Sequence, residues 1–496
     1  MPKLSRIQES RDTWRKKATQ RRLQVVSLLR KCARLDKMGE ALKQECELLK
    51  QENVTLREQL ATSHSIIPMQ KAEVRLLCVF MFCWGKIPCN AIVRLLELFK
   101  GRKILLLDWV PDASSVVNWV ARAGLGYLDA LKPSTDQWVA IIDTSISYGK
   151  DKMLVCLRVP LEHFLVHKCA VSLEHIECVG LVIKSSWNGQ EICSALHTIF
   201  TKVGAPLFIV KDQGADLKAG VRLLKNMMPG IRSVRDIGHV AALLLKKSYA
   251  ENSVYKKFLK MVDVARARLC HAELAFLRPP KIRAKGRFQS ISRLVKWAEK
   301  MCELTKGAGS VEETDIRFKL REVLPGIRSM RFFFARFSRD CSVFDAVLGI
   351  LKNQGLNQTT NKICRDKLKE LPRYSKIRKG LEAWLTETMS LQCRLGIGQT
   401  PLLVSSDILE SLFGVTKSII ERTPSPEFGT LSLATPLLCG EQDHRKIAEA
   451  MQRCSQKSLT KWKNTELINT HRRTKTRLFP KKATAVVQDL RSAYGP

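Results

Sequence analysis

The stretch Pro206 to Asp216, P-L-F-I-V-K-D-Q-G-A-D, decides the fold of this chain. Its apolar run, bounded by Pro206 and Gly214, is typical of a buried strand. Asp212 follows at the C-terminal end of that strand, where open α/β sheets bind their ligands. The stretch Trp138 to Ser145, W-V-A-I-I-D-T-S, has the same build and places Asp143 at a second strand end. If the two strands are neighbours, two carboxylates meet at one edge of a sheet, which is the outline of a metal site.

The length and charge of the chain limit its class. Its 496 residues are too many for one compact core and predict roughly two to four domains. There are 84 Lys and Arg residues against 47 Asp and Glu residues, which gives a formal net charge of +37. Such a field attracts polyanions, so nucleic acid is the expected partner. An anionic membrane surface is less favoured, because the basic residues are spread over the whole chain.

The 16 cysteines are scattered, and no C-x-x-C pair occurs. The N-terminus is polar and basic, without the apolar core of a signal peptide. The longest apolar run, Leu76 to Trp84, is too short to span a bilayer. These features predict a reduced, cytoplasmic protein with no membrane segment, whose cysteines are small buried hydrophobes rather than disulfide partners.

Residues 1–65 are predicted to form a basic helix that continues into a coiled coil. Leucines recur every seven residues, at Leu28, Leu35, Leu42, Leu49 and Leu56. Leu at the d positions with Asn53 at an a position favours a parallel two-stranded coiled coil, so we expect a homodimer or a higher oligomer. A solvated helical hairpin is the alternative, because Gly39 and two cysteines also fall at a positions. The block from Arg15 to Arg22 also suggests a basic zipper, although it is short for that role.

Residues 70–128 are predicted to form a small helical domain. Helices are expected over 72–84 and 89–99, and a third helix begins at Asp112 and ends at Gly124. Polar residues on the outward side of the third helix favour a DNA-binding helix-turn-helix. They are Ser114, Ser115, Asn118 and Arg122. Any three-helix bundle has this pattern, so a purely structural bundle is the alternative.

Residues 135–236 have the pattern of an α/β core. Strands are expected at 137–143, 152–159, 176–183, 207–210 and 231–235, with helices at 190–203 and 215–228. The order of these elements resembles the ribonuclease H fold: three strands, a helix, a strand, a helix and a strand. In that fold the first strand lies beside the fourth, which implies that Asp143 and Asp212 are neighbours. Asp236 ends the last strand and is a further candidate metal ligand.

Residues 237–404 are predicted to be an all-helical insertion with basic faces. A loop over 277–288 interrupts the helices and mixes prolines with basic residues. We expect this loop to contact DNA phosphates, and a solvated loop is the alternative. The candidate contacts are Arg278, Lys281, Arg283, Lys285 and Arg287.

Two further regions complete the chain. Residues 405–422 form a helix that carries Glu410. On the residue pattern alone, Asp407 as N-cap with Glu410 three residues later is a capping box, which needs no catalysis. Residues 423–496 are expected to contain helix around 442–467 and a basic tail that is partly disordered and attracted to phosphates. The tail residues are Arg472, Arg473, Lys475, Arg477, Lys481 and Lys482.

Together these motifs resemble a DDE transposase of bacterial insertion sequences. The resemblance covers residues 70–470 and rests on D-T-S at Asp143, K-D-Q-G at Asp212 and D-I-L-E-S-L-F-G around Glu410. The helical insertion before the glutamate helix is similar to the hAT-like branch. R-D-I-G-H at 235–239 resembles the D-x-x-H that opens the insertion in such enzymes. The implied fold is a ribonuclease H-like α/β core with a large all-α insertion, a coiled coil and a small helical domain.

The resemblance also implies a chemistry. Such enzymes cleave double-stranded DNA at the ends of a mobile element and transfer strands to a target, using two divalent cations about 3.5–4 Å apart. Mg²⁺ or Mn²⁺ is implied, since carboxylates suit hard cations. Asp143 would bind both ions, Asp212 would complete one site and Glu410 the other. The protein would act in the bacterial cytoplasm, at the nucleoid. His239 could lie nearby, although its apolar helix favours a packed core residue.

Other sites and functions are less favoured. His163, His167, Cys169, His175 and Cys178 cluster in the sequence, but H-x3-H-x-C matches no usual zinc pattern. The chain contains no G-x4-G-K-[ST] phosphate loop, so an ATP-driven mechanism is not expected. The alternative from another class is a non-catalytic dimeric DNA-binding protein, or an inactive transposase relic. A structure-specific nuclease of the same fold is a third possibility.

Overall fold

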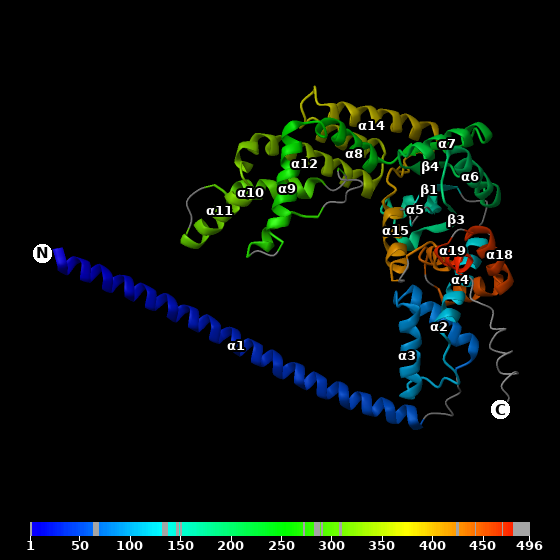
Figure 1. Ribbon diagram of the computed structural model, residues 1–496, viewed down its shortest axis with the longest axis horizontal. Helices are drawn as coiled ribbons and strands as arrows, with labels where there is room; N and C mark the ends of the chain where they lie inside the picture. Colours follow the sequence, from blue (N-terminus) through cyan, green and yellow to red (C-terminus); the bar gives the residue numbers. More distant parts are fainter. Residues whose placement is uncertain are drawn as a thin grey trace. The chain divides into compact units, whose positions relative to one another are not determined.

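Figure 1 shows the computed structural model of the chain. The structure describes residues 2–62, 69–130, 137–144, 148, 151–270, 273–281, 288, 291–306, 310–422, 426–441, 443–468 and 470–479. Contacts divide the chain into two compact units. One unit consists of Met1–Met69 with Lys103–Asp108, and the other of Gln70–Arg102 with Trp109–Pro496.

The first unit is dominated by α1, a single helix of 61 residues from Pro2 to Thr62. Its heptad leucines are exposed, with 60% of Leu28 and 63% of Leu35 accessible. After the helix, the backbone N–H of Met69 donates to the carbonyl of Leu106 at 2.9 Å. The continuous helix agrees with the predicted heptads, and the pairing of two such helices stays a prediction.

The second unit is a mixed α/β fold built around one five-stranded sheet. Its strands are β1 (Trp138–Thr144), β2 (Lys152–Pro160), β3 (Glu177–Lys184), β4 (Phe208–Lys211) and β5 (Arg232–Arg235). They lie in the order β3-β2-β1-β4-β5. Strands β1, β2 and β3 pair antiparallel, whereas β4 runs parallel to β1 and β5 runs parallel to β4. The expected pairing of the first strand with the fourth is therefore present.

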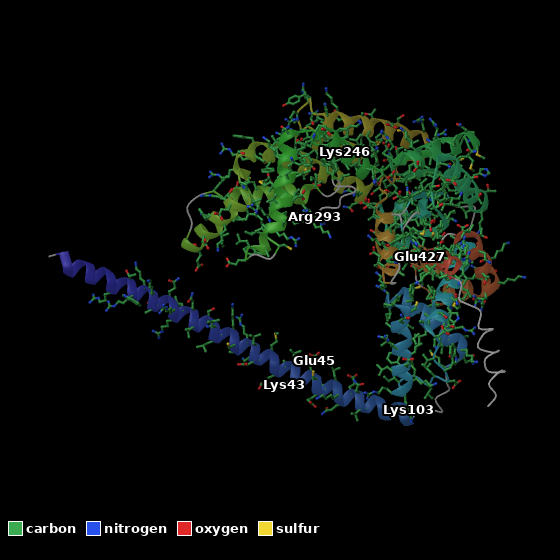
Figure 2. The ribbon with its side chains drawn as sticks, in the orientation of Figure 1. Lys43, Glu45, Lys103, Lys246, Arg293 and Glu427 are labelled. Carbon is green, nitrogen blue, oxygen red and sulfur yellow. The ribbon has the colours of Figure 1, made fainter. Side chains whose placement is uncertain are left out.

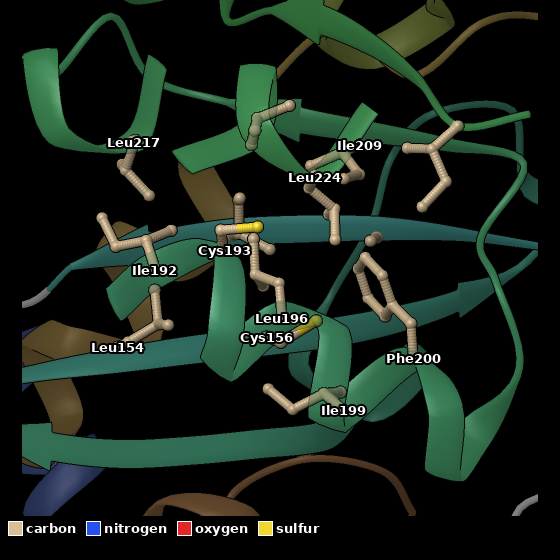
Figure 3. Packing of buried hydrophobic residues seen from close by; sticks show 14 of the residues in the cluster. Leu154, Cys156, Ile192, Cys193, Leu196, Ile199, Phe200, Ile209, Leu217 and Leu224 are labelled. Carbon is tan, nitrogen blue, oxygen red and sulfur yellow. The ribbon is translucent and has the colours of Figure 1, made fainter. Parts of the chain in front are cut away.

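Helices α6 (Gly189–Val203) and α7 (Ala215–Met227) cover one face of this sheet. Leu196 and Phe200 of α6, Leu217 of α7 and Ile209 of β4 belong to one buried cluster (Figure 3). Burying one such side chain contributes about 1.5–3 kcal/mol, so the cluster fixes which face of the sheet these helices cover. The side chains that alternate with the cluster along the strands point to the other face.

Residues 70–130 form α2 (Lys71–Cys83), α3 (Cys89–Gly101) and α4 (Ala113–Asp129), close to the predicted bounds at their N-terminal ends. Helix α4 packs against α2, α3 and later helices, namely α16 (Ala434–Leu437), α17 (His444–Arg453) and α18 (Gln456–Glu466). Gly124 does not end α4 as predicted. A Cβ at this position would lie 1.7 Å from the carbonyl oxygen of Leu433, so the glycine instead permits a close approach of the backbones.

The polar side chains predicted to face DNA from α4 are engaged within the protein. Arg122 donates through Nε to the carbonyl of Cys454 at 2.8 Å and through Nη2 to that of Met451 at 3.0 Å. Asn118 accepts from Lys463 Nζ at 2.8 Å. These side chains therefore join α4 to the later helices, which differs from the predicted recognition helix.

The other two predicted contacts of α4 lie at its start. The hydroxyls of Ser114 and Ser115 donate to the carboxylate of Asp112, which also caps the helix by accepting the N–H of Ser115 at 2.8 Å. The capping bonds hold the pKa of Asp112 at about 2, chiefly through Ser114. Both serines therefore serve helix initiation, and nothing in α4 supports the helix-turn-helix prediction.

Between β5 and residue 404 the described residues form helices and one isolated bridge, from Leu356 to Leu402. The α-helices are α8 (Ile237–Tyr249), α9 (Ser253–Arg268), α10 (Ile291–Leu304), α11 (Val311–Val323), α12 (Arg331–Gln354), α13 (Gln358–Leu368) and α14 (Lys376–Arg394). Tyr249 and Phe337 lie with ring centroids 4.1 Å apart in their core. Basic side chains such as Lys246 and Arg293 project from these helices (Figure 2).

The chain leaves the sheet and returns to it at one place, because the N–H of Ile237 donates to the carbonyl of Val404 at 2.9 Å. The helix α15 (Asp407–Ile420) follows directly. Of the predicted basic tail, α19 (His471–Leu478) contains Arg472, Arg473, Lys475 and Arg477, whereas Lys481 and Lys482 lie outside the described residues.

The 16 cysteines are all free thiols, and most of them are buried, as predicted for small hydrophobic side chains. Burial raises the pKa of Cys83 and of Cys169 to about 12, so both remain neutral thiols. In the part of the chain that the structure describes, helices with the length and apolar character to cross a bilayer are absent.

Candidate active site

Asp143 and Asp212 lie side by side at the C-terminal ends of β1 and β4. The parallel register pairs Ile142 with Lys211, so the two aspartates follow at matching positions. Ile142 belongs to the core beneath α6 and α7. Because side chains alternate along a strand, Asp143 points to the opposite face. The structure thus brings together the two carboxylates that the sequence singled out.

The two carboxylates are oriented by backbone donors and repel each other. The N–H of Thr144 donates to Asp143 Oδ1 at 2.7 Å, and the N–H of Gly214 donates to Asp212 Oδ1. Burial and then the charge of Asp212 raise the pKa of Asp143 to about 7, and the charge of Glu410 adds to this rise. Three carboxylates therefore share one electrostatic field, and a cation between them would relieve their repulsion.

His239 connects Asp212 with Asp236. Its Nδ1 lies 2.9 Å from Asp236 Oδ1, and its Nε2 lies 3.5 Å from Asp212 Oδ2. Burial lowers the pKa of His239, but the hydrogen bond and charge of Asp236, followed by the charges of Asp212 and Asp143, outweigh it and raise the pKa to about 9. The ring is therefore a cation at neutral pH and donates both N–H groups toward carboxylates.

The expectation that His239 is a packed core residue is wrong, because 26% of its side chain is exposed among these carboxylates. Asp236 is the N-cap of α8 and accepts the N–H of His239, which stands three residues later. An aspartate N-cap with a histidine at the third helical position places the ring over the cap. The spacing D-x-x-H directly after a strand is the sequence signal from which the contact between His239 and Asp236 could have been predicted.

Asp236 holds the starts of α8 and α15 together. Its Oδ1 accepts from the N–H of His239 at 2.7 Å and from the His239 ring. Its Oδ2 accepts from the N–H of Ser406 at 2.7 Å and from the Ser406 hydroxyl at 3.0 Å. Burial opposes ionisation, but these partners, His239 first, outweigh it and lower the pKa of Asp236. Four donors engage this buried carboxylate, which indicates a positioning role rather than the metal-ligand role that the sequence allowed.

The predicted capping box around Glu410 is wrong. Helix α15 begins at Asp407 with Ser406 as its N-cap residue. The Ser406 hydroxyl donates a hydrogen bond to Asp236. The Asp407 carboxylate forms an ion pair with Lys352 Nζ of α12 at 2.5 Å. Glu410 is exposed on the first turn of α15, and its charge acts on Asp143. The structure therefore places the third predicted carboxylate in the field of the other two.

The basic loop between α9 and α10 is described only in part. Arg278 and Lys281 are exposed, and the loop is tied to α9 where Arg266 Nη2 donates to the carbonyl of Pro280 at 3.1 Å. The remaining candidate contacts, Arg283, Lys285 and Arg287, lie outside the described residues. The loop stays a predicted contact with DNA phosphates.

No protein-family model matches the chain, and no curated protein matches it. Among solved structures, the chain is similar to the Drosophila P element transposase strand transfer complex, with 11% identity and a TM-score of 0.40. The match covers 83% of this chain and 99% of that one. A similarity of this degree decides neither the fold nor the activity, which must be inferred from the residues of this chain.

Proposed function

We propose that this protein is a DDE-type transposase that cleaves DNA at the ends of a mobile element and transfers the strands to a target. The observation that carries the proposal is the juxtaposition of Asp143 and Asp212 at the ends of paired parallel strands, in one field with Glu410. The strand order β3-β2-β1-β4-β5 supports a ribonuclease H-like core. The helices between β5 and Glu410 support the hAT-like layout.

The residues of this site fit divalent cations. Carboxylate oxygens suit Mg²⁺ or Mn²⁺, and the raised pKa of Asp143 reflects a repulsion that a cation would remove. We infer that Asp143, Asp212 and Glu410 would hold the ions. When bound, the ions would polarise the phosphate and stabilise charge on the attacking and leaving oxygens.

The neighbouring residues orient these carboxylates. His239 donates toward Asp212 through Nε2 and to Asp236 through Nδ1, so it sets the direction of the Asp212 carboxylate. Asp236 in turn binds Ser406 and fixes the first turn of α15, which carries Glu410. The ion pair between His239 and Asp212 and the hydrogen bonds of Asp236 therefore connect Asp212, at the end of β4, with the start of the helix that carries Glu410.

DNA is the substrate that the charge of the protein favours. A net charge of +37 attracts the phosphate backbone, and exposed cations such as Lys246, Arg278 and Arg293 would release counterions on binding. Binding of this kind weakens steeply as salt rises. We infer that a parallel coiled coil through α1 pairs two chains on the DNA.

The proposal is tested by replacing Asp212 with Asn. Purified protein is incubated with Mg²⁺ or Mn²⁺ and a plasmid that contains the DNA flanking the gene, and cleavage and binding are measured separately. The matched control is Asp216→Asn, the same change four residues later on the exposed start of α7. We expect D212N to bind DNA normally and to lose cleavage by several orders of magnitude, whereas D216N keeps both.

The other outcomes select among functions. Unchanged cleavage by D212N would exclude the metal-site assignment. Binding without cleavage by the unmodified protein would indicate the non-catalytic DNA-binding protein or inactive relic. Cleavage without joining of pre-cut ends to a target would indicate a structure-specific nuclease of the same fold.

A further inference from the structure

Three histidines meet in the connection between β2 and β3, on elements separate from the carboxylate cluster. His163 and His167 lie one turn apart on α5 (Leu161–His167), and His175 ends the 3-10 helix η1 (Leu173–His175). Their ring centroids are 4.4–5.1 Å apart. One potential ligand atom from each ring lies within 4.8 Å of the others.

A buried nitrogen of His163 has no hydrogen-bond partner. Its Nε2 is enclosed and unpaired, whereas the ring is held by a hydrogen bond to the backbone of Ala170. Since Nε2 is unpaired, the other nitrogen, Nδ1, makes that bond. A histidine that donates Nδ1–H to a backbone carbonyl presents a bare Nε2, which is how metal-binding histidines are oriented.

The second histidine is held at its Nδ1. The Ser172 N–H donates to His175 Nδ1 at 3.3 Å, and the Ser172 hydroxyl lies 2.9 Å from the same nitrogen. For Nε2 to become the ligand, the ring must carry its proton on Nδ1 and donate it to the hydroxyl, in place of the bond from the Ser172 N–H.

The chain turns sharply to assemble these rings. Lys168, the residue after α5, has a φ of 55°, a region that non-glycine residues rarely adopt. The turn directs the chain back so that η1 returns His175 to His163 and His167. Local backbone strain of this kind persists where surrounding contacts require it.

We propose that His163, His167 and His175 bind one Zn²⁺ ion that joins α5 to η1 and fixes the β2–β3 connection. Imidazole nitrogens suit Zn²⁺, whereas Mg²⁺ prefers the oxygen ligands of the carboxylate site. Zn–N bonds of about 2.0–2.1 Å require the three nitrogens to approach more closely than 4.8 Å. His167 is exposed, so rotation of its side chain would supply this movement. A fourth position is left for water or another ligand.

The connection that the ion would fix contacts the end of α12 and the segment that precedes α15. The N–H of Cys169 donates to the carbonyl of Asn353 at 3.2 Å, and Cys169 Sγ lies 3.8 Å from the carbonyl of Pro401. The following residues line one pocket with Ser405 and Asp407. Zinc would therefore stabilise one wall of the pocket that lies beside the start of the glutamate helix, whether or not the protein is a transposase.

The test measures zinc in tag-free, full-length protein after loading and dialysis, by mass spectrometry of the metal. His167→Ala is the main variant, because this side chain is exposed and we expect the fold to tolerate its loss. His444→Ala, an exposed histidine at the start of α17, is the matched control. We expect the unmodified protein and H444A to retain one more zinc ion per chain than H167A. The Co²⁺-loaded forms should show the same difference in their visible spectra.

A second variant separates metal binding from folding. Ser172→Ala keeps all three ligands and removes the hydroxyl that orients His175, so zinc affinity should fall about 10–100-fold. Zinc should raise the thermal midpoint of the unmodified protein and of Asp212→Asn but not of H167A. Equal zinc retention by H167A and H444A would overturn the proposal, and so would loss of zinc in D212N, because the ion would then belong to the carboxylates.

Discussion

The carboxylate of Asp236 and the backbone N–H of Ser406, 170 positions apart in the chain, are joined by a hydrogen bond of 2.7 Å. This bond links the end of β5 to the start of α15 across the whole helical insertion. Since Glu410 lies on the first turn of α15, the position of a proposed catalytic residue depends on a side chain that belongs to the sheet.

Replacing Asp236 with Ala should destabilise the protein by about 3 kcal/mol or more. The change leaves the backbone N–H groups of His239 and Ser406 buried without an acceptor, at about 1–3 kcal/mol each. Ser406→Ala retains the backbone bond and should destabilise by only about 1 kcal/mol. Urea unfolding midpoints measure both, with Asp216→Ala as an exposed control. A midpoint for D236A close to that of D216A would show that the bond has no structural importance.

Replacing Asp143 with Asn should stabilise the metal-free protein at pH 8 and have little effect at pH 4. The pKa of Asp143 is about 7 in the folded state against a usual 3.8, so the folded protein holds this proton more tightly than the unfolded chain. Stability contributed by the protonated form is therefore lost as pH rises from about 4 to about 7. Thermal midpoints in EDTA across this range provide the measurement. A difference between variant and wild type that does not change with pH would contradict the assignment.

Replacing His239 with Gln should have the opposite dependence on pH. The pKa of His239 is raised from 6.5 to about 9, so its charge stabilises the fold fully below pH 6.5 and ceases to do so as pH rises through 9. The loss of stability in H239Q should be largest near pH 6 and smallest near pH 10 in EDTA. His444→Gln serves as the exposed control. An effect that grows with pH would show that the ring is neutral in the folded protein.

Replacing Gly124 with Ala should destabilise the packing of α4 by about 1–3 kcal/mol or more, because the new methyl group meets the backbone of Leu433. Gly349→Ala on α12 is the matched control, since a Cβ there has no atom within 4 Å. That change should stabilise the protein by about 0.5–1 kcal/mol through helix propensity. Urea unfolding distinguishes the two, and equal effects would contradict the close approach.

The heptad leucines of α1 should determine the oligomeric state. The double change Leu35→Lys and Leu42→Lys places charges at two d positions and should convert the proposed dimer to a monomer in light scattering. Gln44→Lys with Gln51→Lys adds the same charges on the outer face and should leave the mass unchanged. Figure 2 labels Lys43 and Glu45 on this helix. In the proposed coiled coil they would occupy the heptad positions beside the seam, where opposite charges pair between chains. A monomeric unmodified protein would exclude the coiled coil.

The sheet could be predicted from the sequence because its signals are local. Leu207 to Val210 is a continuous apolar run between a proline and a glycine, and the structure has β4 at Phe208–Lys211. Asp143 and Asp212 could be singled out for the same reason, since Asp143 directly follows such a run and Asp212 follows one after Lys211. Their adjacency required only the pairing of β1 with β4.

The missed features depend on contacts that sequence spacing does not contain. Ser406 is the N-cap of α15 rather than Asp407, since Asp236 binds Ser406 and Lys352 binds Asp407. The outward face of α4 is covered because Arg122 reaches Cys454, 332 positions away. A rule based on neighbouring residues can propose a capping box or a recognition helix, but it cannot detect a distant partner that replaces either one.

The bonds from Arg122 to Met451 and Cys454 also bear on how the protein is made. Helix α4 precedes the sheet in the chain, yet three of the helices that pack against it, α16, α17 and α18, are synthesised after the sheet and all of the insertion. While the ribosome is still producing those later residues, the buried side of α4 remains open to chaperones and proteases. A message truncated before codon 451 would yield a product in which the later helices never cover this side of α4. Chaperones and proteases could then recognise the incomplete chain by α4 alone.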